Sequence, residues 1–275
     1  MKQLKSSLAD LRRLCSHAIT VGDIAEPLVS FDQNQPSRVV MDFMEDREYD
    51  VVGVRENGLV TGYAVRSDLG DGLLGEHLRR FVEPDAILAE GEPLLRAFAA
   101  LGDRQHVFVT IFGQIGGIVT RGDLQKTPVR LWLFGLVSLL EMQMLRAVRE
   151  RFPGDGWVRL ISSQRLDGAR KLFAERRRRN EENQLSDCLQ FADKASILMK
   201  DSELFFVCGF PSKRALETFF KEVGTLRNAL AHANDIANGR WPAVVALVTN
   251  LEALLERLEE AGTGRRGGKS GEAVG

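Results

Sequence analysis

The 275-residue chain is long enough for two domains, each with its own hydrophobic core. Its composition, 44% hydrophobic and 27% charged, is that of an ordinary globular protein, and its net charge of −1 excludes a general attraction to nucleic acid or to an anionic membrane. Any site for a polyanion must therefore be local.

The three cysteines, Cys15, Cys188 and Cys208, lie far apart without metal-ligand spacing, and the chain has only four histidines. We therefore expect no zinc site, no other metal and no required cofactor. The polar N-terminus lacks the apolar core of a signal sequence, and the longest uncharged apolar run, residues 131–140, is too short to cross a bilayer. These features predict a cytoplasmic protein with no membrane partner.

The first predicted element is a helix in the N-terminal segment, residues 1–19. Apolar residues recur at helical spacing from Leu4 to Cys15. One face of this helix is apolar, so we expect it to pack on the module that follows.

Residues 20–76 and 77–127 show the same order of elements twice. Each copy has an extended segment, a helix and then two strands joined by a tight turn. The first copy has these elements at 28–31, 37–45, 50–54 and 59–65; the second has them at 85–88, 92–101, 107–112 and 114–120. The repetition predicts a duplicated αβ unit, neither copy of which buries its sheet alone.

Both copies end on one phrase, Gly62-Tyr-Ala-Val-Arg-Ser-Asp-Leu69 and Gly117-Ile-Val-Thr-Arg-Gly-Asp-Leu124. The repeat resembles a pair of CBS domains, the tandem module named after cystathionine β-synthase. In that family a strand ending Gly-x-x-Thr/Ser-x-x-Asp lines a cleft that commonly binds adenine nucleotides.

The resemblance implies an adenine nucleotide (ATP, ADP or AMP) as a regulatory ligand. Thr120 and Asp123 match the pattern in full, and Arg121 can reach a phosphate. Asp68 is the equivalent acid in the first copy, but Val65 replaces the hydroxyl, so we expect that site to be weak or empty. The alternative is that Asp123 only caps the helix that follows, and the two roles can coexist.

Residues 128–261 have helical periodicity throughout, and the whole chain is therefore expected to be α+β. Helices are predicted from Thr127-Pro128 to about residue 151, at 163–180, at 185–199, after Pro211-Ser212, and from Trp241. The first of these is too apolar for a helix with a solvated face, so it is either central to a bundle or buried in a subunit interface. Residues 202–210 are expected to be an irregular connection, and the Gly-rich residues 262–275 to be disordered.

Arg227, Asn228 and His232 stand near the end of the helix that follows Ser212. A guanidinium holds phosphate oxygens and an imidazole exchanges protons near neutral pH, a combination suited to metal-free cleavage of a phosphodiester. Arg227 and His232 lie about 140° apart around a helix, so a second copy of the chain can complete the site. The alternative is a solvated arginine, a local cap and a histidine that interacts with the helix dipole.

The Arg-Asn-x-x-x-His pattern resembles the signature of HEPN domains, all-α bundles that include many ribonucleases. The resemblance implies a homodimer and RNA cleavage to a 2′,3′-cyclic phosphate and a 5′-hydroxyl. Four consecutive arginines, Arg176, Arg177, Arg178 and Arg179, form the densest basic cluster. They can hold an RNA backbone, or they are cations at a solvated helix end, partly neutralised by Glu181 and Glu182.

Together the halves predict a nucleotide sensor that controls a metal-independent endoribonuclease. A second possibility is a non-catalytic regulator whose bundle serves dimerisation and partner docking. A third is an antitoxin-like acceptor of nucleotidyl groups, which the lack of a tyrosine after the motif disfavours.

Overall fold

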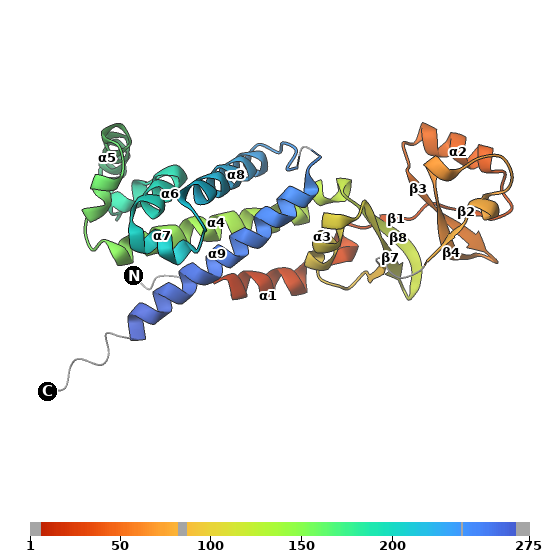
Figure 1. Ribbon diagram of the computed structural model, residues 1–275, viewed down its shortest axis with the longest axis horizontal. Coiled ribbons are helices and arrows are strands. Elements are labelled where there is room, and N and C mark those ends of the chain that lie inside the picture. The colour runs from red at the N-terminus through yellow and green to blue at the C-terminus, as the bar shows by residue number, and fades with distance from the viewer. Residues whose placement is uncertain (1–6, 82–86, 238, 268–275) are drawn as a thin grey trace. The chain divides into compact units, whose positions relative to one another are not determined.

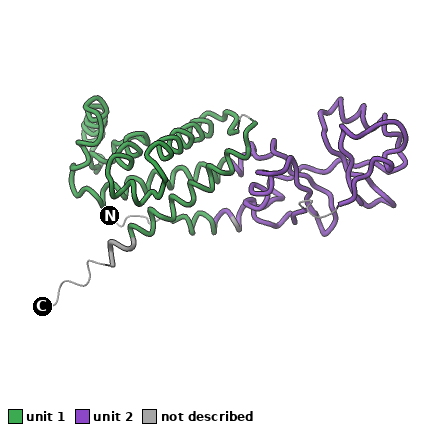
Figure 2. Tube along the Cα trace, viewed as in Figure 1, with its two compact units in different colours: residues 1–13, 130–275 green, residues 14–129 purple. Residues whose placement is uncertain are grey.

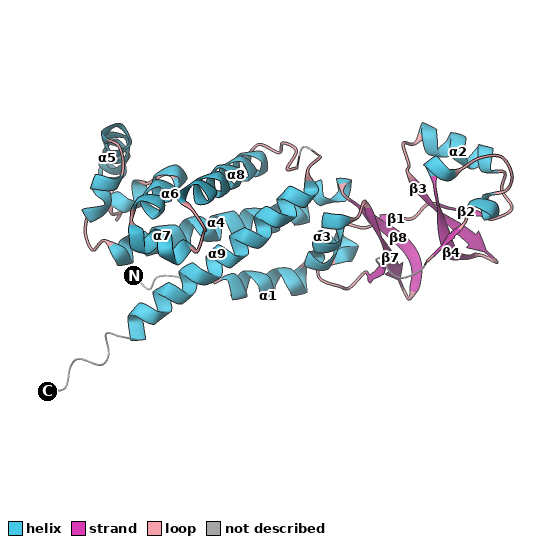
Figure 3. Ribbon diagram, viewed as in Figure 1, coloured by secondary structure: helices cyan, strands magenta, loops and turns pink. Residues whose placement is uncertain are grey.

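The computed structural model describes residues 7–81, 87–237 and 239–267 (Figure 1). The chain divides into two compact units: unit 1 comprises residues 1–13 and 130–275, and unit 2 comprises residues 14–129 (Figure 2). Every named strand lies in unit 2 (Figure 3). The division falls inside two helices, α1 (Leu8–Ala18) and α4 (Thr127–Arg151).

Unit 2 contains two four-stranded sheets of the same design. The first has the order β2-β3-β4-β5 and carries α2, and the second has the order β1-β8-β7-β6 and carries α3. The bounds in the first are β2 (Ser30–Asp32), α2 (Ser37–Asp46), β3 (Val51–Glu56), β4 (Leu59–Val65) and β5 (Arg79–Arg80). Those in the second are β1 (Glu26–Pro27), β6 (Ile87–Ala89), α3 (Leu94–Asp103), β7 (His106–Ile111) and β8 (Gln114–Thr120).

The duplication extends to an irregularity in the hairpins. The register of β3 and β4 shifts between Val54 and Arg55, and that of β7 and β8 shifts between Val109 and Thr110. In each copy a parallel pair, β2 with β3 or β6 with β7, precedes the hairpin. Shared topology with a shift at the equivalent place agrees with the predicted repeat.

Two short strands cross between the copies. β1 pairs antiparallel with β8 of the second sheet, and β5 pairs with β4 of the first. The expected border between residues 76 and 77 therefore does not separate the two sheets. Each short strand covers an edge of a hairpin strand whose hydrogen-bonding groups otherwise lack partners.

A second consequence of the duplication is a core that both copies share. Leu28 and Tyr63 from the first copy pack with Phe108 from the second. The ring centroids of Tyr63 and Phe108 lie 4.8 Å apart, and those of Phe81 and Phe108 lie 4.9 Å apart. Apolar faces of the two hairpins thus cover each other.

The two hairpin turns differ at one informative residue. Asn57 and Gly58 have φ values of 51° and 83°; Phe112 and Gly113 have φ values of 50° and 80°. The left-handed conformation favours asparagine, whereas for a bulky residue it is strained. Phe112 is also 95% exposed and gains little burial in return.

We expect Phe112→Asn to raise the free energy of unfolding of unit 2 by about 1 kcal/mol, because asparagine tolerates this backbone conformation better than phenylalanine. Urea unfolding followed by circular dichroism measures the change. The reciprocal Asn57→Phe is the matched control and should be destabilising. A Phe112→Asn protein with a lower unfolding midpoint than the parent would contradict the argument.

Among its described residues, unit 1 has helices joined by loops and turns and no named strand. After α4 it contains α5 (Ser163–Arg178), α6 (Phe191–Lys200), α7 (Ser202–Cys208), α8 (Lys213–Ala231) and α9 (Trp241–Gly267). The predicted start of α8 is confirmed, since the Ser212 side chain accepts a hydrogen bond of 3.1 Å from the backbone N–H of Ala215. α6 contacts α7 and α8, and both of these contact α9.

Three expectations for this unit differ from the structure. Residues 185–199 are not one helix, since a 3₁₀ turn at Leu185–Cys188 precedes α6. The segment expected to be irregular forms α7: the Asp201 carboxylate accepts hydrogen bonds from two backbone N–H groups at its start, and Gly209, at φ 67°, ends it. α9 continues to Gly267, beyond the expected end at residue 261, and residues 268–275 lie outside the described residues.

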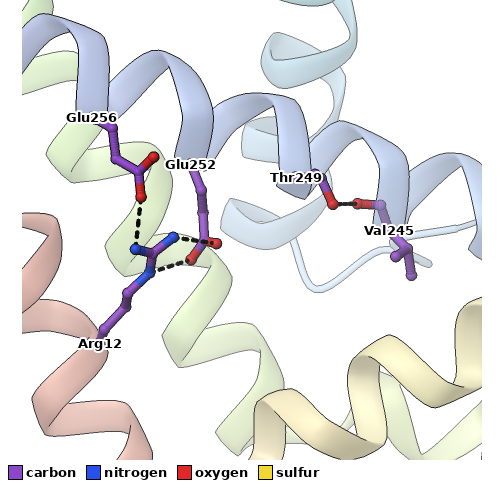
Figure 4. A network of polar contacts seen from close by, with 5 residues as sticks. All are labelled: Arg12, Val245, Thr249, Glu252 and Glu256. Atoms are coloured by element: carbon purple, nitrogen blue, oxygen red, sulfur yellow. Dashed lines mark hydrogen bonds and ion pairs between the residues drawn. The ribbon is translucent and has the colours of Figure 1, made fainter.

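The first part of α1 belongs to unit 1, whereas we expected this helix to pack on the duplicated module. The Arg12 guanidinium pairs with Glu252 at 2.8 Å and with Glu256 at 2.7 Å, both on α9 (Figure 4). The backbone N–H of Leu8 donates to Glu259 at 2.8 Å. Gly135 allows close packing, because a Cβ there would lie 3.1 Å from Leu11. The carboxylates of α9 thus bind polar groups of α1, a contact that the apolar periodicity of α1 does not predict.

Among the described residues, one helix, α4, has the length and composition of a membrane span. Slightly more than half of its most apolar window, 56%, is buried inside the protein. Trp132, Leu133 and Leu140 are among its fully buried residues. This burial fits the prediction of a helix central to a bundle.

The thiol of Cys208, at the end of α7, has no exposed surface, and this burial raises its pKa to about 12. Compared with a thiol of pKa 9.0, its thiolate fraction at pH 8.5 falls by roughly 1000-fold. We expect Cys208 to resist iodoacetamide in the native protein and to react in urea. Peptide mass spectrometry measures the labelling, with Cys208→Ser as the control; rapid native labelling would contradict the burial.

Candidate functional site

The end of β8 places a buried carboxylate in a tight turn. The backbone N–H and the hydroxyl of Thr120 donate to Asp123 Oδ2 at 2.7 and 2.8 Å. Asp123 is 8% exposed, and its other oxygen lies 2.9 Å from Lys126 Nζ. Lys126 also donates to the Ile24 carbonyl at 2.7 Å and pairs with Glu26. Both Asp123 oxygens therefore have partners within unit 2.

The charge of Lys126 follows from these contacts. Burial by itself lowers the pKa of this ammonium, but hydrogen bonds to Glu26 and Asp123 outweigh burial and leave the pKa raised. Lys126 is therefore protonated at neutral pH. The turn thus joins a carboxylate, a hydroxyl and a cation, which together suit a ribose and a phosphate.

The Thr-x-x-Asp turn alone does not identify such a site. Thr20 and Asp23 form the same hydrogen bonds, 2.6 and 3.0 Å, at another 3₁₀ turn of unit 2, but Asp23 is exposed. Burial of the carboxylate and the neighbouring lysine distinguish Asp123. The capping role that we weighed is not the arrangement seen: Asp123 lies within the 3₁₀ turn Gly122–Gln125, and its carboxylate accepts hydrogen bonds from Thr120, which precedes that turn.

The Arg121 guanidinium is hydrogen-bonded to backbone carbonyls within unit 2. It donates to the carbonyls of Leu101 and Gly102, each at 3.0 Å, near the end of α3. A cation there interacts favourably with the last carbonyls of a helix. Contact between Arg121 and a phosphate stays a prediction, and the two hydrogen bonds restrict the directions in which its remaining N–H groups can reach one.

The equivalent position in the first copy is arranged differently. Asp68 forms an ion pair with Arg79 of β5 and accepts a hydrogen bond of 3.1 Å from the Ser67 hydroxyl. Val65 has no hydroxyl to place beside it. The strand that crosses into this sheet therefore supplies a guanidinium that a ligand at Asp68 would have to displace.

In unit 1, the motif residues lie at the end of α8. Arg227, Asn228 and His232 are all exposed, and His232 follows the last helical residue. The backbone N–H of His232 donates to the Asn228 carbonyl at 3.1 Å. Exposure leaves the three side chains accessible to a large substrate.

Sequence reasoning found no acid near this motif, but the structure places Glu141 of α4 there. Its Oε2 lies 3.8 Å from Arg227 Nε, and its Oε1 lies 2.8 Å from Lys194 Nζ on α6. The signal in the sequence was a single acid within the apolar face of a long helix. Periodicity alone could not assign its partners, because they come from α6 and α8.

The four arginines at the end of α5 do not act as one patch. Arg176 donates to the Asp187 carbonyl at 3.3 Å and lies 3.9 Å from Glu181. The Arg177 guanidinium lies over the ring of Phe173, 5.7 Å from its centroid. Arg178 and Arg179 are exposed, so contact with an RNA backbone stays a prediction for the run.

A cavity of about 1300 Å³ lies beside this run, between the end of α4, α5 and the turn at Leu185–Cys188. Its lining mixes both charges, and Arg149 and Asp187 form an ion pair of 2.5 Å across part of it. The described residues contain no group of three or more histidine, cysteine or acidic side chains suited to a metal ion.

No family model matches the chain, and no curated protein matches it. Solved structures of CBS-domain proteins are similar to part of it. CBSX2 from Arabidopsis thaliana is 15% identical in sequence to this chain, with a TM-score of 0.35. The match covers 41% of this chain and 95% of the CBSX2 chain. A structure of CBSX2 in complex with AMP has 16% identity, with coverage of 41% and 97% and a TM-score of 0.36. The CBS domains of a transcriptional regulator from Streptococcus pneumoniae have 16% identity, with coverage of 38% and 96% and a TM-score of 0.34. Nearly the whole of each of these solved chains is thus similar to about two fifths of this chain.

Proposed function

We propose that unit 2 is a nucleotide-sensing regulatory module of the CBS type, with its competent site at Asp123. The observation that carries the proposal is the buried carboxylate that ends β8, held between Thr120 and Lys126 in a duplicated αβ unit. The closing phrase of the second copy matches the family pattern in full, and the pattern implies an adenine nucleotide.

Binding exchanges contacts at this turn. The two ribose hydroxyls donate to the Asp123 carboxylate, and Lys126, whose ammonium in the unliganded protein is shared between Asp123 and Glu26, turns its charge toward the phosphate. Thr120 keeps the carboxylate oriented through its backbone N–H. The first copy does not bind, because Asp68 is paired with Arg79 and Val65 lacks a hydroxyl.

We expect Asp123→Asn to weaken binding of AMP and ATP by roughly 10-fold or more, because a hydrogen bond to a charged group is worth about 1.5–3 kcal/mol. Asparagine retains an oxygen for the Thr120 N–H and so preserves the turn. Isothermal titration calorimetry measures the affinities. Asp68→Asn is the matched control and should bind AMP and ATP as the parent protein does. An Asp123→Asn protein that binds them with the affinity of the parent would contradict the assignment of the site to Asp123.

For unit 1, we propose that Arg227, Asn228 and His232 form the centre of a metal-independent endoribonuclease of the HEPN type, controlled by unit 2. The observation that favours it is the exposure of all three side chains at one end of α8, with Arg227 beside Glu141. Arg227 stabilises charge on the phosphorane-like transition state, and His232 transfers the proton of the 2′-hydroxyl or of the leaving group. A homodimer brings two such helix ends together.

We expect the protein to cleave end-labelled RNA in EDTA, and His232→Ala to lower the rate by roughly 10²–10⁴-fold, the range for loss of a general acid or base. Product ends should be a 2′,3′-cyclic phosphate and a 5′-hydroxyl. The assay is run with and without AMP or ATP. Equal background cleavage by both proteins would favour the alternative function, a nucleotide-sensing docking regulator without catalysis.

A further inference from the structure

Glu141 stands between two cations contributed by different helices of unit 1. Its two carboxylate oxygens face Lys194 of α6 and Arg227 of α8, as the neighbouring positions of α4, α6 and α8 in Figure 1 allow. The side chain of Lys194 is only 6% exposed, that of Glu141 is 27% exposed, and that of Arg227 is 47% exposed. The cluster therefore runs from a buried ammonium to a half-exposed guanidinium.

The burial of the Lys194 ammonium needs an explanation. Taking an ammonium out of water is costly, and among the described residues the partner that the structure gives Lys194 is Glu141. A buried ion pair is a weak source of stability, because apolar residues of similar volume often stabilise a protein equally well. Stability alone therefore does not explain why α6 places a lysine here.

The charge balance supplies the reason. If Glu141 faced Arg227 alone, the carboxylate would cancel the guanidinium and oppose binding of a phosphate. Lys194 takes the hydrogen bond of 2.8 Å, so Arg227 keeps a contact of 3.8 Å through Nε and the cluster keeps a net charge of about +1. The contact with Glu141 involves Nε, and in the proposed role the two terminal nitrogens of the guanidinium, which form its planar fork, bind the phosphate.

We propose that Glu141 and Lys194 are positioning residues for Arg227: Glu141 orients the guanidinium toward an RNA phosphodiester, and Lys194 leaves the cluster with a net positive charge. This inference rests on the ribonuclease function proposed for unit 1. Neither residue touches substrate, and both act through Arg227.

The test measures RNA affinity and cleavage separately. Kd values of full-length His232→Ala protein for a fluorescent single-stranded oligoribonucleotide are determined at fixed salt by anisotropy. In that background Lys194→Met should weaken binding by roughly 10-fold, whereas Glu141→Gln should tighten it several-fold, because the first removes a positive charge and the second a negative one. With His232 intact, Glu141→Gln should nevertheless lower kcat, because Arg227 loses its orientation.

A double variant and two control variants make the result decisive. Glu141→Gln with Lys194→Met removes both charges, restores the net charge of the cluster, and should return RNA affinity to near that of the parent even if one single variant folds poorly. Glu217→Gln and Lys221→Met break an exposed ion pair of 2.8 Å on α8 and serve as controls that should shift affinity less than 2-fold.

The outcomes separate the two proposals. Opposite shifts that cancel in the double variant support positioning; shifts in the same direction, or equal shifts in the controls, overturn it. A parent protein that binds RNA through Arg227 with these opposite shifts, yet does not cleave it, overturns the ribonuclease function while leaving the positioning of Arg227 supported.

Discussion

The burial of α4 is the constraint on which unit 1 depends. A 25-residue helix with so many apolar side chains buries much of its surface, although Leu131 and Phe134 remain 64% and 48% exposed, and each polar group that it carries inward then needs a partner from another helix. Arg151 pairs with Asp201, the residue that caps α7, and Arg146 donates to the Leu258 carbonyl of α9. Glu141 likewise finds its partners on other helices, in the cations Lys194 and Arg227. The polar contacts that fix the order of helices and the cluster around Arg227 thus have one origin.

In unit 2 the corresponding constraint is duplication with divergence. Both copies need a hairpin face covered by the other, so the shared core of Leu28, Tyr63 and Phe108 preserves the pair as a whole. The closing turns are outside that core and are free to differ. One retains a hydroxyl and a lysine beside its acid, and the other has lost the hydroxyl and gained an ion pair with Arg79.

The sequence predicted most elements whose ends carry local signals. The hairpins, the start of α4 at Thr127-Pro128 and the cap at Ser212 depend on turn and capping chemistry within a few residues. α7 differs from the prediction of an irregular connection although Asp201 and Gly209 are such signals, because the apolar run between them has no clear helical periodicity. The packing of α1 could not be predicted, since Arg12 finds its carboxylates about 240 residues away.

The same limit applies to the candidate sites. The Thr120 and Asp123 pair is visible in the sequence because it is local, whereas the links from Lys126 to Ile24 and Glu26 join segments about 100 residues apart. The contacts of Arg121 with the carbonyls at the end of α3 could not be predicted from the sequence, because they depend on the fold. Glu141 and Lys194 had no motif at all, and only the packing of three helices identifies them.

The proposed control of unit 1 by unit 2 has a covalent route through the start of α4. Lys126 immediately precedes α4, whose first three residues belong to unit 2 and whose remainder belongs to unit 1. A ligand that takes Asp123 from Lys126 therefore changes the contacts of the residue before the helix that carries Glu141. Coupling of this kind is reciprocal in binding free energy, so a nucleotide that alters the affinity of unit 1 for RNA has its own affinity altered by RNA to the same extent.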